Sequence, residues 1–354
     1  MVTLKEIAEI CNVSVTTVSN ILNGKAKAGE ETKKRVLEVV KEMGYQPNYI
    51  AQGLRNNKTK TIGIIAEDLA QFTTPGIIES IMAYCEEKGY RTIVQNLRMY
   101  ARWSDRWYNN DALYYSILEP AMQTLLSFKV DGIIYVAGHA RVIHAFQENM
   151  QKPAVMTYAF SDYSNIPSVV IDDEKSSYEL VKYLVDMGHR KIGVIGGLAT
   201  NIHTQERLLG YQKALFEAKI LYEPSLVCYG DFERITGYQK AQTLIEAGVS
   251  AIFCMTDRIA GGVYDYMEEH GLVVGKDVSV VGFDDQDIAS YFRPSLTTTK
   301  LPIYEIGYRS AEILLDMLEV EKDKNGTPQQ NIKEEIRIPC EIQYRNSVGK
   351  WSDH

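Results

Sequence analysis

Residues 14–22, SVTTVSNIL, combine short polar and apolar side chains in a pattern that suits the recognition of base edges. The bulkier apolar residues recur at helical spacing and define an inward face. The side chains left on the outer face are all short: Val15, Thr16, Ser19 and Asn20. An Asn amide pairs with N6 and N7 of adenine, and Val or Thr methyl groups contact the thymine methyl. The segment therefore predicts a helix that lies in a DNA major groove.

Neighbouring helices must position this segment. Residues 4–43 predict three short helices, with Thr3 and Glu6 as a capping box for the first and Asn12-Val13 as the break before the second. This is helix–turn–helix spacing, in which the first helix supports the second. Thr17 and Ser14, with Lys5 and Lys25 nearby, suit contacts to phosphate oxygens, and Thr3 and Asn23 are further candidate DNA contacts. A purely structural three-helix cap is the alternative.

Charge is distributed unevenly along the 354 residues. Residues 1–60 carry ten Lys and Arg against six Asp and Glu, whereas the remainder carries 28 against 40. A basic head on an acidic body predicts that only the head binds a polyanion.

The sequence lacks the motifs of disulfide-rich, metal-binding, membrane-spanning and catalytic proteins. The five Cys are isolated without CxxC spacing, which predicts reduced thiols and neither a disulfide framework nor a zinc site. The N-terminus has no apolar leader, and no stretch approaches the ~20 apolar residues of a membrane span, so we expect a soluble cytoplasmic protein without a membrane partner. No P-loop or nucleophile-elbow sequence is present. Nothing predicts a catalytic residue, a metal site or a cofactor.

From Thr61 onward, apolar runs of four to six residues, such as TIGIIA, GIIYVA and KIGVIGG, alternate with longer helical segments. This rhythm predicts a parallel sheet with helices on both faces. About 285 residues of it exceed one α/β domain, so we expect two similar lobes.

Long stretches of the sequence resemble the lactose/galactose repressor (LacI/GalR) family. TLKEIAEICNVSVTTVSNILNG and TKKRVLEVVKEMGYQPNYIAQGLR are similar to the head of that family nearly residue for residue. IGIIAEDL, VDGII, MGHRKIGVIGG, ERLLGY, VSVVGFDD and LTTTK then match in order, so the resemblance covers residues 3–345.

The resemblance implies an α/β chain, with an all-α helix–turn–helix head and a periplasmic-binding-protein-like body of two parallel-sheet lobes. We assign residues 1–47 to the DNA-binding head, 48–60 to a hinge helix and linker, 61–345 to effector binding and dimerisation, and 346–354 to a tail. Lobe 1 is expected over about 61–171 and 302–326, and lobe 2 over about 172–300 and 334–345.

The resemblance also implies that Asn48–Arg55 is a hinge helix that binds the minor groove. An eight-residue helix is unstable alone in water, so DNA and a partner subunit would order it. Leu54 would be the apolar wedge in the central base step, with Ala51 against the groove floor and Asn48 as a further contact. Alternatively, Leu54 is a linker residue that packs on the body.

In this family a small effector, commonly a sugar, binds between the lobes at the carboxyl ends of the strands. By resemblance, Arg207 is a donor and Asp284 an acceptor for hydroxyls, and Phe232 stacks on the ring. Further candidates at this edge are Glu67, Asp68, Tyr158, Thr256 and Asp257. The alternatives are a surface ion pair for Arg207 and an N-cap for Asp284.

Residues 97–119 form a segment longer than the family usually has here. Its aromatic residues are Tyr100, Trp103, Trp107, Tyr108, Tyr114 and Tyr115. They form either a platform over the cleft, suited to a larger or glycosidic ligand, or an insertion packed on the lobe surface or at a dimer contact.

We therefore expect a repressor that binds a pseudo-palindromic operator in double-stranded DNA as a homodimer, with an affinity that a sugar effector changes. Release by an inducer is expected, with corepression or a phosphocarrier protein partner as alternatives. A sugar-transport protein and an enzyme on the same fold are the rival classes. The basic head argues against the first, and the lack of a nucleophile–base pair argues against the second.

Overall fold

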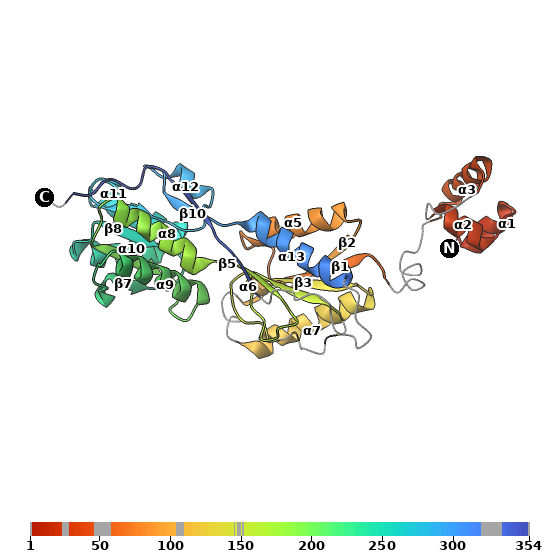
Figure 1. Cartoon of the computed structure of the whole chain (residues 1–354), viewed down its shortest axis with the longest axis horizontal. Helices are drawn as coiled ribbons and strands as arrows, with labels where there is room; N and C mark the ends of the chain where they lie inside the picture. Colours follow the sequence, from red (N-terminus) through yellow and green to blue (C-terminus); the bar gives the residue numbers. More distant parts are fainter. Residues whose placement is uncertain are drawn as a thin grey trace. The chain divides into compact units, whose positions relative to one another are not determined.

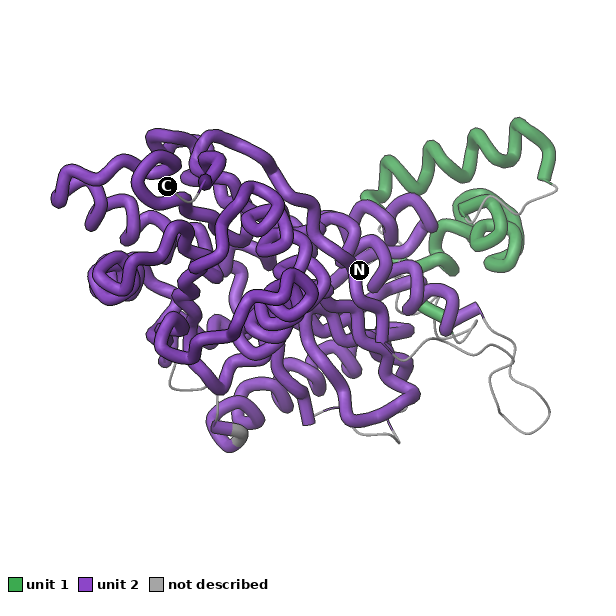
Figure 2. Tube along the Cα trace, turned by 60° about the vertical axis from the view of Figure 1, so that its left-hand side comes forward, with its two compact units in different colours: residues 1–59 green, residues 60–354 purple. Residues whose placement is uncertain are grey.

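The computed structural model describes residues 2–22, 28–45, 58–103, 110–144, 146, 150, 152–319 and 335–352. The chain forms two compact units, residues 1–59 and 60–354 (Figure 2). Several positions singled out above lie outside the described residues: Asn23, Lys25, Asn48, Ala51, Leu54, Trp107 and Tyr108.

Three helices form the described part of the first unit: α1 (Leu4–Ile10), α2 (Val15–Leu22) and α3 (Glu30–Glu42) (Figure 1). The predicted capping box is present, because the N–H of Thr3 donates to Glu6 Oε2 at 2.7 Å and the N–H of Glu6 donates to Thr3 Oγ1 at 3.3 Å. Asn12 adopts a φ of 49° between α1 and α2, a left-handed conformation in which Asn is enriched. The small core of this unit contains Ile7, Ala8, Cys11, Val18, Ile21 and Val36. The predicted helix–turn–helix head is confirmed.

The second unit contains two lobes, each built on a sheet (Figure 1). The sheet of lobe 1 is parallel, in the order β11-β5-β4-β3-β1-β2. Its strands are β1 (Thr61–Ala66), β2 (Arg91–Asn96), β3 (Gly132–Val136), β4 (Ala154–Thr157), β5 (Ser168–Ile171) and β11 (Glu335–Ile338). Helices α5 (Thr74–Glu87) and α13 (Ile303–Glu319) cover one face, and α6 (Met99–Trp103) and α7 (Asp111–Ser127) cover the other. Consecutive residues of β1 therefore enter two different cores, which explains its unbroken apolar sequence.

Lobe 2 has four parallel strands in the order β7-β6-β8-β9. They are β6 (Ile192–Gly196), β7 (Val227–Tyr229), β8 (Ala251–Cys254) and β9 (Ser279–Val281). Helices α8 (Asp173–Asp186) and α9 (Ile202–Glu217) pack on one face, and α10 (Arg234–Glu246) and α11 (Asp257–Glu269) pack on the other. The shorter elements are η2 (Pro224–Leu226), α12 (Ile288–Tyr291) and an antiparallel pair of β10 (Thr298–Lys300) with β12 (Glu341–Gln343). The predicted two-lobed α/β body is confirmed.

The chain passes between the lobes three times: from β5 to α8, from β10 to α13, and from β11 to β12. The third crossing corrects the sequence-based assignment of residues 334–345 to lobe 2. Strand β11 pairs in parallel with β5, so residues 335–338 belong to lobe 1. The pairing is non-local, which is why no sequence pattern indicated it.

Residues beyond 345 are part of lobe 2 and do not form a separate tail as predicted. Ser347 is fully buried, and its hydroxyl donates to the carbonyl of Val280 at 2.6 Å. The N–H of Trp351 donates to the carbonyl of Met187 at 2.8 Å. Buried backbone groups need such partners, so the final described residues complete the lobe.

Helices α5 and α13 approach each other closely at a glycine. A methyl group at Gly307 would overlap the carbonyl oxygen of Ile77 and the hydroxyl of Ser80 on α5. A backbone carbonyl cannot move aside as a flexible side chain can, so any larger residue at 307 must separate the helices.

We predict that Gly307→Ala lowers the free energy of unfolding by about 1–3 kcal/mol, because the two helices must shift apart. Chemical denaturation followed by circular dichroism measures this loss. Asp316→Ala, at an exposed position of the same helix, is the control and is expected to change stability by about 0.5 kcal/mol or less. Equal stabilities of the two variants would contradict the close approach.

Candidate functional site

A cleft between the two lobes gathers side chains from both and encloses about 80 Å³. Lobe 1 contributes Gln71, Phe72, Thr73, Gly138, His139 and Tyr158. Lobe 2 contributes His203, Arg207, Phe232, Thr256, Arg258, Asp284 and Gln286. The lining therefore combines ionisable groups, amides, hydroxyls and aromatic rings.

Five of the eight predicted effector residues line this cleft: Tyr158, Arg207, Phe232, Thr256 and Asp284. Four of them follow strands closely, with Tyr158 after β4, Phe232 after β7, Thr256 after β8 and Asp284 after β9. Parallel strands bring their carboxyl ends to one edge of a sheet, which is where α/β sheets bind ligands. The strand order therefore accounts for their convergence.

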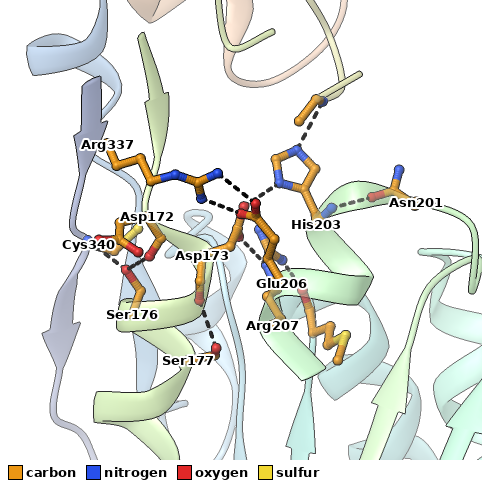
Figure 3. Close-up of polar contacts among 12 residues, drawn as sticks. Asp172, Asp173, Ser176, Ser177, Asn201, His203, Glu206, Arg207, Arg337 and Cys340 are labelled. Carbon is orange, nitrogen blue, oxygen red and sulfur yellow. Dashed lines mark hydrogen bonds and ion pairs between the residues drawn. The ribbon is translucent and has the colours of Figure 1, made fainter. Parts of the chain in front are cut away.

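Asp173, the first residue of α8, binds Arg207 of α9 (Figure 3). The Nε of Arg207 donates to Asp173 Oδ1 at 2.6 Å, and Nη1 donates to the carbonyl of Met255. The same Nη1 lies 3.9 Å from Asp284 Oδ1, and the guanidinium carbon lies 3.7 Å from the centre of the Phe283 ring. Arg207 is thus fixed on several sides, with one edge toward the second carboxylate.

Asp173 also binds His203, one helical turn before Arg207 on α9. His203 Nδ1 lies 2.6 Å from Asp173 Oδ2, and His203 Nε2 lies 3.1 Å from the backbone nitrogen of Ala140 in lobe 1. Burial would raise the pKa of Asp173, but the charge of Arg207 and the contact with His203 outweigh it and hold that pKa below its usual value. Asp173 is therefore an ionised carboxylate that holds two cleft-lining side chains, His203 and Arg207, in place.

Two cleft residues have left-handed backbones, Asp284 with φ of 115° and Tyr158 with φ of 60°. Such conformations cost about 1–3 kcal/mol each and are concentrated at functional sites. The N–H of Asp284 donates to the carbonyl of Thr299 at 2.9 Å, and Gln286 Nε2 donates to Asp284 Oδ2 at 3.2 Å. Burial raises the pKa of Asp284 to about 6, against the opposing charge of Arg207. A carboxylate has about four acceptor sites, so Asp284 can accept further hydrogen bonds.

Glu67 and Asp68, two further predicted effector residues, do not line the cleft in this structure. Glu67 Oε1 accepts from Tyr135 Oη and from Arg141 Nη2, both at 2.5 Å, and Oε2 accepts from the N–H of Gly138 at 2.7 Å. Asp68 Oδ2 accepts from two backbone N–H groups in α6, at 3.0 and 3.2 Å. Both carboxylates are buried, and a buried charge must be paired. Their partners lie within lobe 1.

Asp257 also lies behind the cleft. Its Oδ1 accepts from Thr298 Oγ1 at 2.5 Å, and its Oδ2 accepts from the N–H of Gln286 at 2.8 Å. Burial and the nearby charge of Asp284 raise the pKa of Asp257 well above its usual value. Its neighbour Thr256 accepts from the N–H of Ile259 at 3.2 Å and so caps α11. Of this pair, only Thr256 lines the cleft.

Three of the described aromatic residues of segment 97–119, Trp103, Tyr114 and Tyr115, pack on lobe 1, whereas Tyr100 is 44% exposed. Tyr114 is 2% exposed, and the guanidinium carbon of Arg141 lies 4.5 Å from the centre of its ring. Trp103 and Tyr115 contact the same apolar core, and none of the described aromatic residues lines the cleft. This arrangement favours the packed insertion over the platform.

Sequence reasoning did not single out Asp173, His203, Thr73 or Gln286. A sequence signal for Asp173 did exist, because the acidic run DDE follows directly after the apolar strand SVVI. The hydroxyl of Thr73 is buried without a hydrogen-bond partner among the described residues, although it belongs to the cleft lining. Buried polar groups are normally satisfied, so the Thr73 hydroxyl is an exception beside the cleft.

The first unit carries the predicted base-reading residues on α2. Val15, Thr16 and Asn20 are exposed, and Thr17 and Ser19 are half-buried. The hydroxyls of Ser14 and Thr3 serve as helix caps, since Ser14 Oγ accepts from the N–H of Thr17 at 3.0 Å. Lys5 Nζ lies 4.0 Å from the carboxylate of Glu9. The outer face of α2 is therefore open to a partner in this unit.

Among the residues that the structure describes, no group of three His, Cys, Asp or Glu side chains is arranged to hold a metal ion. No helix within the same ranges is long and apolar enough to cross a membrane. All five Cys are free.

Comparison with protein families matches two parts of the chain separately. Bacterial regulatory proteins of the lacI family match residues 3–48, which include α1, α2 and α3. A periplasmic binding protein-like domain matches residues 181–348, which include most of lobe 2.

Curated relatives match nearly the whole chain. Catabolite control protein A of Priestia megaterium is 30% identical over 98% of this chain and 99% of that protein. The ribose operon repressor of Haemophilus influenzae is 31% identical over 90% of this chain and 92% of that protein. A crystal structure of the lac repressor dimer bound to operator and an anti-inducer has the same fold, with a TM-score of 0.76 over 98% of each chain at 24% identity. The chain therefore belongs to the lacI family of bacterial regulatory proteins.

Proposed function

We propose that this lacI-family member is a cytoplasmic repressor that binds a pseudo-palindromic operator as a homodimer and responds to a sugar-like effector. One observation carries the proposal: a single chain combines an open outer face on α2 with a polar and aromatic cleft between two lobes. The related ribose operon repressor, named for a sugar operon, supports the effector class.

The DNA-binding role rests on α2. Asn20 is the proposed adenine reader, and Val15 and Thr16 are proposed to contact thymine methyl groups. Ser19 completes the base-reading face, while Thr3, Lys5, Ser14, Thr17 and Asn23 are proposed to fix the register on phosphates. The proposed minor-groove contacts are Asn48, Ala51 and Leu54.

The effector role rests on the chemistry of the cleft. Asp284 offers carboxylate acceptor sites, Thr73 offers a hydroxyl, and Arg207 offers a guanidinium edge. The rings of Phe232 and His139 are stacked, with centroids 6.4 Å apart and planes 16° apart, and so present aromatic surface. Convergent polar groups beside an aromatic face suit a polyhydroxylated ring. Tyr158 and Thr256 are proposed to complete the contacts.

A groove on lobe 2 supports the homodimer. It lies between α10, α11 and residues 291–294, and its apolar side chains include Ile235, which is 56% exposed, and Tyr291, which is 72% exposed. Arg234 Nε and Asp265 Oδ2 form an ion pair beside them at 2.6 Å. Exposed apolar groups next to charged ones are typical of protein interfaces. A second copy on this surface would also supply the second head that a palindrome requires.

We propose that effector binding changes the closure of the two lobes and relieves repression. A ligand that contacts both lobes favours one relative placement of them, and coupling of about 1–3 kcal/mol is typical of allosteric proteins.

We predict that Asn20→Ala weakens binding to the operator by about 1–3 kcal/mol, because one bidentate base contact is lost, and changes binding to scrambled duplex little. Leu54→Ala is expected to weaken operator binding as well, through loss of the apolar wedge. Gel-shift titration against the chain's own upstream region measures both. Glu38→Gln, at an exposed position on α3, is the control. Wild-type operator binding by both variants would refute the DNA assignments.

We predict that Asp284→Asn lowers effector affinity at least about tenfold, because a charge-assisted hydrogen bond becomes a neutral one. Asn is preferable to removal of Arg207, which would leave Asp173 and Asp284 buried without a counter-charge at a cost of about 3–5 kcal/mol. Calorimetric titration with the sugar selected from a carbohydrate thermal-shift panel gives the affinity. Asp287→Asn, an exposed carboxylate outside the cleft, is the matched control. If Asp284→Asn binds as tightly as wild type, Asp284 is not an effector ligand.

We predict that Ile235→Asp shifts the dimer toward monomer and raises the dimer dissociation constant at least about tenfold, because a charge replaces an apolar anchor. Sedimentation velocity over a concentration series reports this shift. Phe216→Ser removes a side chain that is 82% exposed but lies outside the groove, so it should leave the dimer intact. The opposite pattern would place the interface elsewhere.

A further inference from the structure

Helix α9, which carries Arg207, contacts lobe 1 at two points (Figure 3). His203 Nε2 lies 3.1 Å from the backbone nitrogen of Ala140, in the segment that follows β3. Three residues further along α9, the carboxylate oxygens of Glu206 lie 2.8 Å from two guanidinium nitrogens of Arg337 on β11. Residues three apart lie on the same face of a helix, so one face of α9 carries both contacts.

The contact at His203 defines which ring nitrogen carries the proton. A backbone N–H can only donate, so Nε2 must be the acceptor from Ala140. Nδ1 lies 2.6 Å from Asp173 Oδ2, which can only accept while it is ionised, so Nδ1 carries the hydrogen. The imidazole is therefore neutral, and its single donor and single acceptor are both in use.

We propose that His203 is a proton-sensitive latch between the lobes. A neutral ring holds Ala140 and keeps the two lobes together at this point. A protonated ring is a donor at both nitrogens, so Nε2–H would face the N–H of Ala140 and the contact would break. The separated form therefore binds one proton more than the latched form, and by linkage a fall in pH favours separation.

Each side of the latch is anchored in its own lobe, which determines where it breaks. The segment that carries Ala140 is held by Glu67, which accepts from the N–H of Gly138 at 2.7 Å and from Arg141 Nη2 at 2.5 Å. His203 is held by Asp173 in lobe 2, and protonation strengthens that bond because it becomes an ion pair. Neither anchor weakens on protonation, so only the bond between the lobes is lost.

Other charged or titratable groups surround His203. Asp173 on α8 contacts it directly, and Arg207 lies one turn further along α9. The ring of Tyr158, after β4, lies 5.2 Å from the imidazole. Asp284, after β9, has a pKa raised by burial to about 6 and so titrates in the same pH range as an imidazole. The test must therefore separate His203 from Asp284.

The regulatory consequence rests on the proposed function, because it assumes that lobe closure sets operator affinity. The latch itself does not, and it can be measured without DNA or effector. A failed latch and a failed repressor assignment are therefore distinguishable.

Hydrogen–deuterium exchange of the full-length protein reports the latch directly through the amide of Ala140. The protection factor, corrected for the intrinsic pH dependence of exchange, is compared at about pH 8 and pH 5, where imidazoles change charge. We expect Ala140 protection to fall about fivefold or more, the scale of one lost hydrogen bond. The amide of Ile143, bonded to the carbonyl of Phe160 at 2.9 Å within lobe 1, is the internal reference and should keep its protection.

Three variants assign the effect. His203→Gln has no titratable ring, so protection of Ala140 should no longer change with pH. Asp284→Asn removes the competing carboxylate and should retain the pH dependence. Glu206→Gln weakens the second contact between the lobes and should lower Ala140 protection at both pH values while retaining its pH dependence. Thermal melting establishes that each variant is folded. A flat wild-type profile, an unchanged profile in His203→Gln, or loss of the pH dependence in Asp284→Asn overturns the proposal.

Discussion

The cleft depends on one buried guanidinium beside two carboxylates. Removing Arg207, Asp173 and Asp284 from water is costly, and their mutual attraction and hydrogen bonds must offset that cost. Asp173 begins α8 directly after the first crossing between lobes, and Arg207 lies on α9, so their bond fixes the two helices against each other at the cleft edge. Arg207 also binds the carbonyl of Met255 just after β8, which ties the helices to the sheet. Ligand chemistry and lobe architecture therefore depend on the same charges.

The guanidinium is shared unequally between its two carboxylates. Asp173 receives a hydrogen bond of 2.6 Å, whereas Asp284 lies 3.9 Å away. Burial raises the pKa of both groups, but Arg207 and His203 overcome burial at Asp173, while burial prevails at Asp284 and raises its pKa to about 6. Asp173 is therefore engaged by Arg207 and His203, whereas Asp284 accepts one hydrogen bond from Gln286 and has acceptor sites left over.

The parts of the fold that sequence predicted are those with local causes. The capping box of Thr3 and Glu6 and the two-faced burial of β1 follow from neighbouring residues alone. Strands β7, β10 and β12 have only three residues each, too few for a periodicity, and β11 is defined by a distant partner. Arg207 and Asp284 were accessible through family resemblance. Family resemblance did not point to Asp173 or His203. Their place at the cleft depends on the crossing after β5 and on the contact with the segment around Ala140, which are tertiary features.

Three of the predicted effector residues, Glu67, Asp68 and Asp257, do not line the cleft. They have suitable chemistry and lie one to three residues after strands, as do four of the five predicted residues that line the cleft. Thr256 and Asp257 are the N-cap and the first residue of α11, and of the two only Thr256 lines the cleft. A single sequence does not specify which side chains in the segment after a strand face the cleft.

Helix α9 is joined to lobe 1 by one hydrogen bond at His203 and one ion pair at Glu206. The pair of Glu206 with Arg337 is bidentate and partly exposed, with 18% and 32% of each side chain accessible. The hydrogen bond from Ala140 to His203 is worth about 1 kcal/mol net. A ligand with a few kcal/mol of differential affinity can outweigh both. The strong charges at Asp173 and Arg207 are confined to one lobe, so closure can be adjusted without any buried ion losing its partner.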